Sequence, residues 1–413
     1  MIRQRPVELL APARNVECAM AAVDHGADAV YIGASRFGAR ASAGNSVEDI
    51  ARVVEYAHTF RVKVYVTVNT ILKDEELPET EKLVWALYRA GVDALIVQDM
   101  ALLELDLPPI PLHASTQMDN RTPDKVKFLH GLGFSQVVLA RELSLAEIQA
   151  VHAACDVPLE VFVHGALCVS YSGQCYVSQH CFGRSANRGE CAQFCRLKFD
   201  MVDSDGRMIE QGRHLLSLKD MNRGADLERL LDAGVTSLKI EGRLKDVAYV
   251  KNVTAWYRSR LDEIFKRRPE YRRASSGHVS LAFTPCLEKS FNRGFTRYFL
   301  DGRTPDIFSF HTPKSLGEEV GTVKDVRGRC IVVSGVKPFA NGDGLCFLDE
   351  QGNLQGFRVN RVEANKIYPA EMPRVRPHAR LYRNFDKAFE DVLSRPSAVR
   401  KIRVEWTLGE DAE

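Results

Sequence analysis

The sequence predicts an α/β protein: a (β/α)8 barrel of the TIM type with a cysteine-rich insertion between its seventh and eighth strands, followed by a small all-β domain. Three observations predict this architecture. Eight short β-branched segments alternate with amphipathic segments, and glycines stand where a helical segment gives way to a strand. From about Leu316 the pattern changes to short alternating segments separated by turns.

The eight barrel strands are expected at residues 6–13, 27–33, 62–69, 93–99, 111–117, 136–142, 159–167 and 236–243. Helices are expected between most of them, at residues 46–60, 79–90, 123–132 and 145–154. Apolar strands separated by helices pair in parallel with both faces covered, and eight such units close into a barrel. Gly26, Gly91 and Gly234 stand at helix-to-strand junctions, where a helix end favours positive φ.

The chain is long enough for two cores, because it has 413 residues. About 70 residues separate the seventh and eighth strands, where a crossover needs only about 10 to 20. We therefore expect a barrel domain at residues 1–275 with the insertion at 168–213, a linker at 276–315 and a β-barrel-like accessory domain at 316–413. A long basic helix is expected at 256–273. Strands of the accessory domain are expected at 319–326, 329–333, 344–348, 356–362, 366–369 and 399–407.

Composition predicts a cytoplasmic protein with no membrane partner. No apolar run approaches the roughly 20 residues that a membrane span needs, and the first residues contain no signal-peptide core. The net charge of +2 says little about partners, but residues 251–273 hold eight Lys and Arg against three acids. Residues 355–403 hold twelve against five, with aromatic residues interleaved. Such stretches fit an RNA-facing surface, and they equally fit a solvated helix face or a linker.

Five of the ten cysteines crowd into the insertion, and four of them have a spacing that suits a metal centre. Cys168, Cys175, Cys191 and Cys195 follow the pattern Cys-x6-Cys-x15-Cys-x3-Cys, and Cys181 is a fifth candidate. Four thiolates complete a 4Fe-4S cluster, since each iron takes one soft protein ligand. Structural zinc normally uses two short knuckles, of which only one is present. The cluster is the favoured interpretation, with zinc and unligated thiols as alternatives.

Polar residues gather at the C-terminal ends of the expected strands, where barrel enzymes form their active sites. They are Thr67, Asn69, Gln98, Asp99, His113, Ser115, Thr116, Gln117, Arg141, Glu142, His164, Glu241 and Arg243. Any one of them alone could be a loop cap or a satisfied buried group, but their number on one rim predicts a functional cleft. The sequence contains no zinc-protease, nucleophile-elbow or phosphate-loop motif, so hydrolysis lacks an evident mechanism.

Several motifs together resemble those of the collagenase-like peptidases, peptidase family U32. They are the run 160–178 around Cys168 and Cys175, and the segments 8–13, 26–33, 113–117, 216–220 and 237–243. Better-understood members of this family resemble oxygen-independent hydroxylases that carry a 4Fe-4S cluster and draw on prephenate. Its branches form 5-hydroxycytidine in rRNA, form 5-hydroxyuridine in tRNA, or hydroxylate the ubiquinone ring as a protein pair. Segment 183–196 is most similar to the rRNA branch.

The resemblance implies roles for individual residues. Cys168, Cys175, Cys191 and Cys195 would hold the cluster. A dicarboxylate such as prephenate needs cationic donors, so Arg141 and Arg243, with His113 and His164 nearby, are candidates for its site. Glu241 is the fifth candidate catalytic residue, although a structural ion pair between Arg141 or Arg243 and Glu142 or Glu241 is the alternative.

The implied activity is C5-hydroxylation of a pyrimidine in rRNA or tRNA. Two alternatives stay open: a collagenase-like peptidase, and a non-catalytic, cluster-bearing partner of a paralogous hydroxylase.

Overall fold

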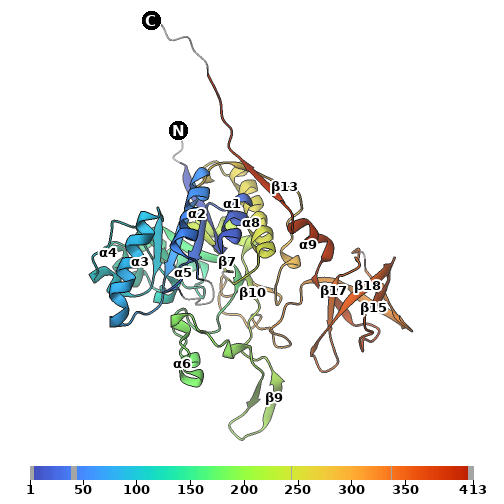
Figure 1. Cartoon of the computed structure of the whole chain (residues 1–413). Helices are drawn as coiled ribbons and strands as arrows, with labels where there is room; N and C mark the ends of the chain where they lie inside the picture. Colours follow the sequence, from blue (N-terminus) through green and yellow to red (C-terminus); the bar gives the residue numbers. More distant parts are fainter. Residues whose placement is uncertain (1–3, 39–43, 243, 336, 408–413) are drawn as a thin grey trace.

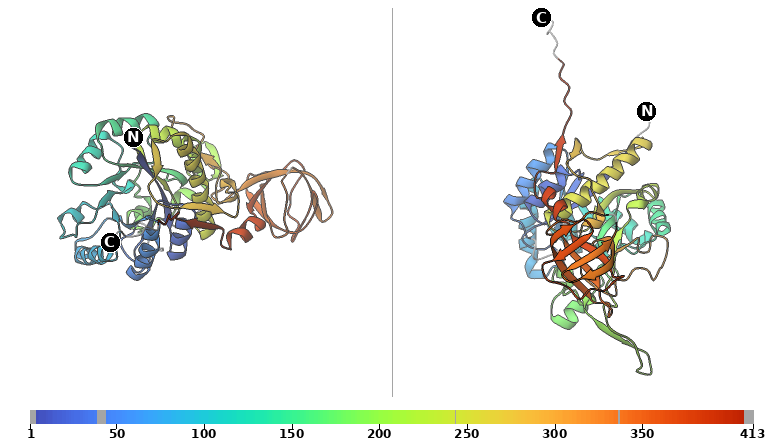
Figure 2. Two further views of the ribbon diagram at one scale, coloured as in Figure 1. Left: turned by 90° about the horizontal axis from the view of Figure 1, so that it is seen from above. Right: turned by 90° about the vertical axis from the view of Figure 1, so that its right-hand side faces the viewer.

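The first domain is a closed barrel of eight parallel strands, as the sequence predicts. The computed structural model describes residues 4–38, 44–242, 244–335 and 337–407. The barrel strands are β1 (Arg5–Ala13), β2 (Ala29–Gly33), β3 (Lys63–Val68), β4 (Ala94–Val97), β5 (Leu112–Ala114), β6 (Gln136–Val138), β7 (Leu159–Ala166) and β11 (Val235–Ile240). They pair in chain order, and β11 pairs with both β7 and β1 to close the ring. Figure 2 shows this ring from above, with helices around it.

Helices cover the outside of the barrel. They are α1 (Val16–Asp24), α2 (Val47–Thr59), α3 (Leu77–Arg89), α4 (Pro123–Gly131), α5 (Leu145–Ala154), α7 (Leu227–Asp232) and α8 (Val247–Arg267). The four helices predicted between residues 46 and 154 are confirmed as α2 to α5. Their starts follow from local chemistry, because Ser46, Thr122 and Ser144 each accept a hydrogen bond from the backbone N–H three residues later. No helix in the described part of the chain combines the length and apolar character that a bilayer crossing requires.

The predicted basic helix has different bounds and a different environment from those expected. It begins at Val247 rather than at residue 256 and ends at Arg267, because Asp246 caps its start. Its face toward β1 is buried, and Arg258 on that face pairs with Asp28 at 3.0 Å. The far end of α8 lies beside the first residues of β1, so its basic residues are at the opposite end of the barrel from the cysteine insertion (Figure 1).

The segment expected as a linker is part of the folded structure. It contains β13 (His278–Leu281) and β14 (Phe295–Thr296), preceded by β12 (Tyr271–Arg273), which pairs with β1. β14 pairs with β10 (Asp220–Asn222), and β10 runs antiparallel to β7, which extends the sheet beyond the barrel. Phe299 and Ile307 are buried in the same apolar cluster as Phe162. The expectation of a linker at 276–315 was therefore wrong, because these residues bury apolar side chains against the barrel.

The C-terminal region contains a second closed barrel, with six antiparallel strands (Figures 1 and 2). They are β15 (Glu318–Arg327), β16 (Cys330–Ser334), β17 (Gly344–Leu348), β18 (Leu354–Glu363), β19 (Lys366–Pro369) and β20 (Arg380–Phe385). The first five match predicted strands, whereas β20 and α9 (Lys387–Leu393) were missed. The strand expected at 399–407 was wrongly placed: β21 (Ala398–Lys401) lies outside this small β-barrel and pairs with β13.

Candidate cysteine site at the barrel mouth

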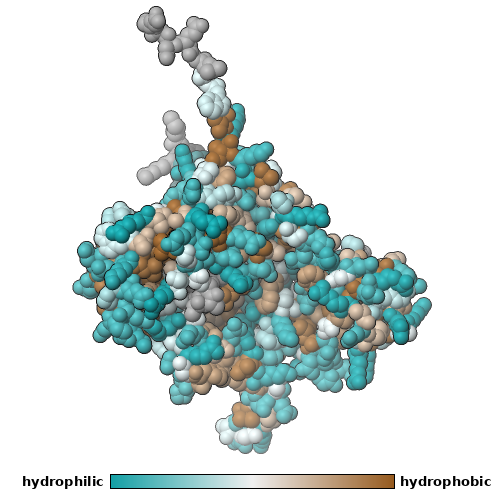
Figure 3. All heavy atoms as spheres, viewed as in Figure 1, coloured by the Kyte–Doolittle hydropathy of each residue, from teal (hydrophilic) through white to brown (hydrophobic). Residues whose placement is uncertain are grey.

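The insertion after β7 lies over the C-terminal ends of the barrel strands. It contains α6 (Val177–Phe182) and a hairpin of β8 (Phe199–Val202) and β9 (Met208–Arg213), which project from the barrel (Figure 1). Met201, Val202, Met208 and Ile209 of this hairpin are exposed, and apolar side chains lie among polar ones on the protrusion (Figure 3).

Specific contacts attach the loop between Cys168 and Cys175 to the rim. Glu142, which follows β6, accepts hydrogen bonds from the backbone N–H and the hydroxyl of Ser172, both at 3.0 Å. The next residue, Gly173, has φ of +77°, and a Cβ there would stand 1.9 Å from the carbonyl oxygen of Gln117. Only glycine allows both this backbone conformation and this close approach. The loop therefore has a defined position against the ends of β5 and β6.

The loop before Cys191 is attached on the other side of the mouth. Arg188 donates hydrogen bonds to both carboxylate oxygens of Glu76, at 2.6 and 2.9 Å, and to the carbonyl of Ile71 at 2.6 Å. The hydrogen bond from Arg188 lowers the pKa of Glu76 to about 2. Since Ile71 and Glu76 follow β3, the insertion spans the opening from one side to the other.

Arg196 connects the loop that contains Cys195 to two further segments. It donates to the hydroxyl of Ser217 at 2.8 Å, to the carbonyl of Leu218 at 2.9 Å and to the carbonyl of Leu167 at 3.1 Å. Leu167 directly precedes Cys168, and Arg196 directly follows Cys195. The guanidinium of Arg196 therefore fixes the backbone beside Cys195 relative to the backbone beside Cys168. Burial lowers the pKa of Arg196, and nearby Cys195 and Cys168 act in the opposite direction.

The four candidate thiols lie close enough to influence one another electrostatically. Burial raises the pKa of Cys195, and the charges of Cys168, Cys191 and Cys175 raise it further. Burial likewise raises the pKa of Cys168, with contributions from Cys175 and Cys191. Cys181, on α6, is exposed and is not among the main charges that act on either group. Unpaired thiolates repel one another, so a cationic group would stabilise all four together.

The residues of the insertion suit a 4Fe-4S cluster in number and kind, because four thiols can supply one soft ligand to each iron. In the part of the chain that the structure describes, no three His, Cys, Asp or Glu side chains converge as ligands of one ion. In a 4Fe-4S cluster each thiolate binds a different iron, so the sulfurs stand further apart. Burial raises the pKa of Cys168 and of Cys195, and the positive charges of Arg141 and Arg196, respectively, oppose this effect, which suits an anionic centre.

Two of the predicted rim residues form a direct ion pair beside this site. Arg141 donates to Glu241 at 2.8 Å, and both side chains are largely buried. The guanidinium also stacks over the ring of Phe162, with its Cζ 3.8 Å from the ring centroid. This is the ion pair that the sequence analysis weighed against a binding role. The Nε of Arg141 is buried and has no hydrogen-bond partner among the described residues.

The two predicted histidines occupy different surroundings. His113, on β5, lies inside the barrel with its ring 4.6 Å from that of Tyr65, and its Nδ1 has no partner among the described residues. His164, on β7, is enclosed by aromatic rings, and the Tyr257 hydroxyl lies 3.4 Å from its Nδ1. Burial lowers the pKa of each histidine to about 3, so both are neutral at physiological pH. Arg243, the remaining candidate, lies outside the described residues.

A polar network that was not predicted from the sequence lies inside the barrel. Lys239 pairs with Glu160 at 2.6 Å, and Gln136 donates to the other oxygen of Glu160 at 2.6 Å. Glu8 accepts from Tyr65 at 2.6 Å and from the hydroxyl of Ser237 at 2.8 Å. Burial raises the pKa of Glu8 to about 7. Charged residues in the middle of otherwise apolar strands were the signal that could have revealed this network.

The chain is similar to proteins of one family along most of its length. The profile of peptidase family U32 matches residues 14–308. The chain is 51% identical over 412 residues to the "23S rRNA 5-hydroxycytidine C2501 synthase" of Escherichia coli, which covers 98% of this chain and 63% of that protein. It is 33% identical to the "tRNA hydroxylation protein P1" of Bacillus subtilis, over 91% of this chain and 96% of that protein.

A third relative has a different name. The chain is 29% identical to the "Collagenase" of Porphyromonas gingivalis, over 93% of this chain and 99% of that protein. The profile match covers the barrel from α1 onward and the cysteine insertion described above, and the Bacillus relative is matched over nearly its whole length. This chain therefore belongs to peptidase family U32.

Proposed function

We propose that this protein is an RNA-modifying enzyme that hydroxylates C5 of a pyrimidine, with a 4Fe-4S cluster on Cys168, Cys175, Cys191 and Cys195. The observation that supports the proposal is the attachment of the cysteine insertion across the mouth of the barrel through Ser172, Arg188 and Arg196. A bound cluster supplies one-electron redox chemistry there. The chain's own residues define the site around it: Arg141 offers a cationic donor for a carboxylate co-substrate such as prephenate, and the Glu241 carboxylate orients it.

A cytidine in rRNA is the favoured target, and the wobble uridine of tRNA is the alternative. The identity to the rRNA synthase is higher than that to the tRNA hydroxylation protein, which supports this order. The chain spans 63% of the length of the rRNA synthase, so the target is part of the proposal. We further propose a cytoplasmic location, since the RNA substrates are there.

Oxygen-free purification followed by iron and sulfide analysis tests the cluster. The wild type should contain about four irons per chain, and serine at any of the four cysteines should lower this strongly. Cys181→Ser is the matched control, because this cysteine lies in the same insertion and should leave the iron content unchanged.

Nucleoside mass spectrometry tests the activity. Cells that lack the gene should lose one hydroxypyrimidine, which the wild type but not the Cys168→Ser variant restores. Unchanged nucleosides in both rRNA and tRNA would refute the proposed reaction. Gelatin cleavage by a protein without the four thiols would favour the peptidase instead, and co-purification with a paralogue would favour a partner role.

A further inference from the structure

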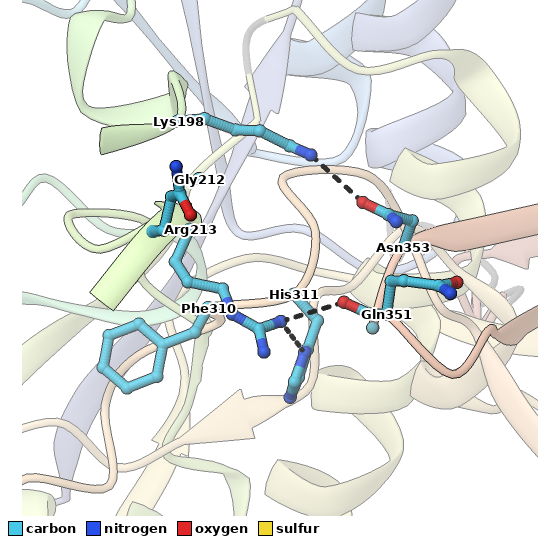
Figure 4. Close-up of a pocket in the computed structure, with 9 residues that line it drawn as sticks. Lys198, Gly212, Arg213, Phe310, His311, Gln351 and Asn353 are labelled. Carbon is cyan, nitrogen blue, oxygen red and sulfur yellow. Dashed lines mark hydrogen bonds between the residues drawn. The ribbon is translucent and has the colours of Figure 1, made fainter. Parts of the chain in front are cut away.

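A polar cavity lies where the insertion meets the small β-barrel (Figure 4). We call it the junction cavity; its volume is about 280 Å³. Lys198 and Arg213 from the insertion, Phe310 and His311, and the turn 351–353 between β17 and β18 line it. Three segments far apart in the sequence thus build one site, and it opens to solvent beside the projecting hairpin.

The lining of the junction cavity is cationic. Its charged side chains are Lys198 and Arg213, beside His311, and no carboxylate is among the described residues that line it. Lys198 donates to the side-chain oxygen of Asn353 at 3.1 Å, whereas Arg213 reaches Nδ1 of His311 at 3.3 Å and the carbonyl of Gln351 at 3.4 Å. None of these partners is a carboxylate, and the two Arg213 contacts are long. An anion in the cavity would make stronger, charge-assisted hydrogen bonds with both cations.

Carboxylates adjoin the lining of the cavity without being part of it. Asp200 accepts a hydrogen bond from the N–H of Gly212 at 2.7 Å, and Asp349 accepts from the N–H groups of Gln351 and Asn353. Glu210, three residues before Arg213 on β9, lies 3.8 Å from the Nε of Arg213, and about half of its side chain is exposed. A pair that long and exposed contributes little. The outer nitrogens of Arg213 therefore stay available toward the cavity, where Figure 4 shows the guanidinium pointing at His311 and Gln351.

An aromatic surface adjoins the cations. Phe310 is 43% exposed and stacks on Phe308, with ring centroids 5.2 Å apart and an angle of 9° between the rings. Phe308 is partly buried against the apolar cluster of the barrel, so it holds the exposed ring in place. An exposed aromatic face next to cations is the combination that binds single-stranded nucleic acid, because bases stack while phosphates pair.

The junction cavity is coupled to the cysteine site through the backbone. The N–H of His214 donates to the carbonyl of Phe310 at 3.1 Å, and Nδ1 of His214 lies 2.9 Å from the carbonyl of Arg196. Lys198 follows Cys195 by three residues. A ligand in the cavity is therefore held at a fixed place relative to Cys195.

We infer that the junction cavity binds a backbone phosphate of single-stranded RNA through Lys198 and Arg213, while a neighbouring base stacks on Phe310. This inference rests on the proposed function and names the surface by which the RNA partner reaches the cysteine site. It assigns RNA binding to the junction of the two barrels rather than to the basic end of α8, whose Arg267 and Arg268 already pair with Glu228 and Asp232.

The test is the affinity of the full-length protein for a labelled single-stranded oligopyrimidine RNA over a range of salt concentrations. The double variant Lys198→Gln/Arg213→Gln should weaken binding and lower the salt slope by about 0.7 for each lost phosphate contact. Phe310→Ala should weaken binding roughly fivefold or more, and Phe310→Trp should restore it. The control Lys266→Gln/Arg267→Gln removes the same charge from α8 and should bind as the wild type does.

The outcomes separate this inference from the proposed function. If the wild type hydroxylates RNA but the double variant binds RNA like the control, the junction cavity is not the RNA site and the function stands. If inorganic phosphate competes as well as RNA and Phe310→Ala has no effect, the cavity is only an anion site, which also overturns the inference. If the wild type neither binds RNA nor restores the hydroxypyrimidine, both proposals fail.

Discussion

Replacing Arg196 with glutamine should release the Cys195 loop from the barrel. The guanidinium makes three hydrogen bonds, to Ser217, Leu218 and Leu167. A hydrogen bond to a charged group contributes about 1.5 kcal/mol at the low end of its range, so the three together stabilise the closed loop by about 4 kcal/mol. That corresponds to roughly a thousandfold change in the equilibrium for local opening.

Hydrogen exchange on the metal-free protein measures this opening directly. The amides of residues 196 and 197, which donate to Gln193 and Phe194, should exchange up to a thousandfold faster in Arg196→Gln. The iron content after oxygen-free purification should fall as well, because the positions of Cys195 and Cys168 are no longer fixed relative to each other. Arg184→Gln removes an exposed arginine from the same insertion and is the control. Wild-type exchange together with wild-type iron content in Arg196→Gln would refute the reasoning.

Three further predictions follow from the geometry. Gly173→Ala should lower the iron content, since its Cβ would overlap the carbonyl of Gln117. The control is Gly183→Ala, which is also at positive φ but has open space around it. It should lower the free energy of unfolding by only about 1 to 2 kcal/mol and keep the iron. Between pH 4.5 and about 7 folded Glu8 keeps a proton that the unfolded chain releases, so its contribution to stability falls by about 3 kcal/mol as pH rises. Denaturant titrations should show Glu8→Gln gaining on the wild type across this window; a constant difference would contradict the raised pKa. Arg141→Gln should lower the free energy of unfolding by about 2 kcal/mol in the same assay, because it breaks the pair with Glu241. It should also lower hydroxylation more than RNA binding. Equal losses of both would argue against a role beside the reacting groups.

Local patterns along the chain were enough to predict the larger barrel. All eight strands appear where β-branched segments stood, and the helices between them begin at caps that the sequence displays. The small β-barrel was also predicted, except for β20, which escaped detection. Its residue Arg383 breaks the apolar alternation, because it stands at a buried position and pairs with Glu318 at 2.6 Å. A buried charge is tolerated there only through partners that are distant in the sequence.

The cysteine spacing indicated a metal centre, and the rim position of Arg141 and Glu241 followed from the strand ends. Tertiary structure decided the rest. Three features depend on closure of the sheet. They are the ion pair of Arg141 with Glu241, the enclosure of His164 by α8 and β14, and the hydrogen bond between Glu8 and Tyr65 across the barrel. The junction cavity likewise needs two barrels in contact.

Sequence by itself determined the periodic elements, since strand and helix patterns are read from neighbours a few residues apart. Only the fold brought together groups that are far apart in the sequence, because burial and pairing are properties of the packed chain.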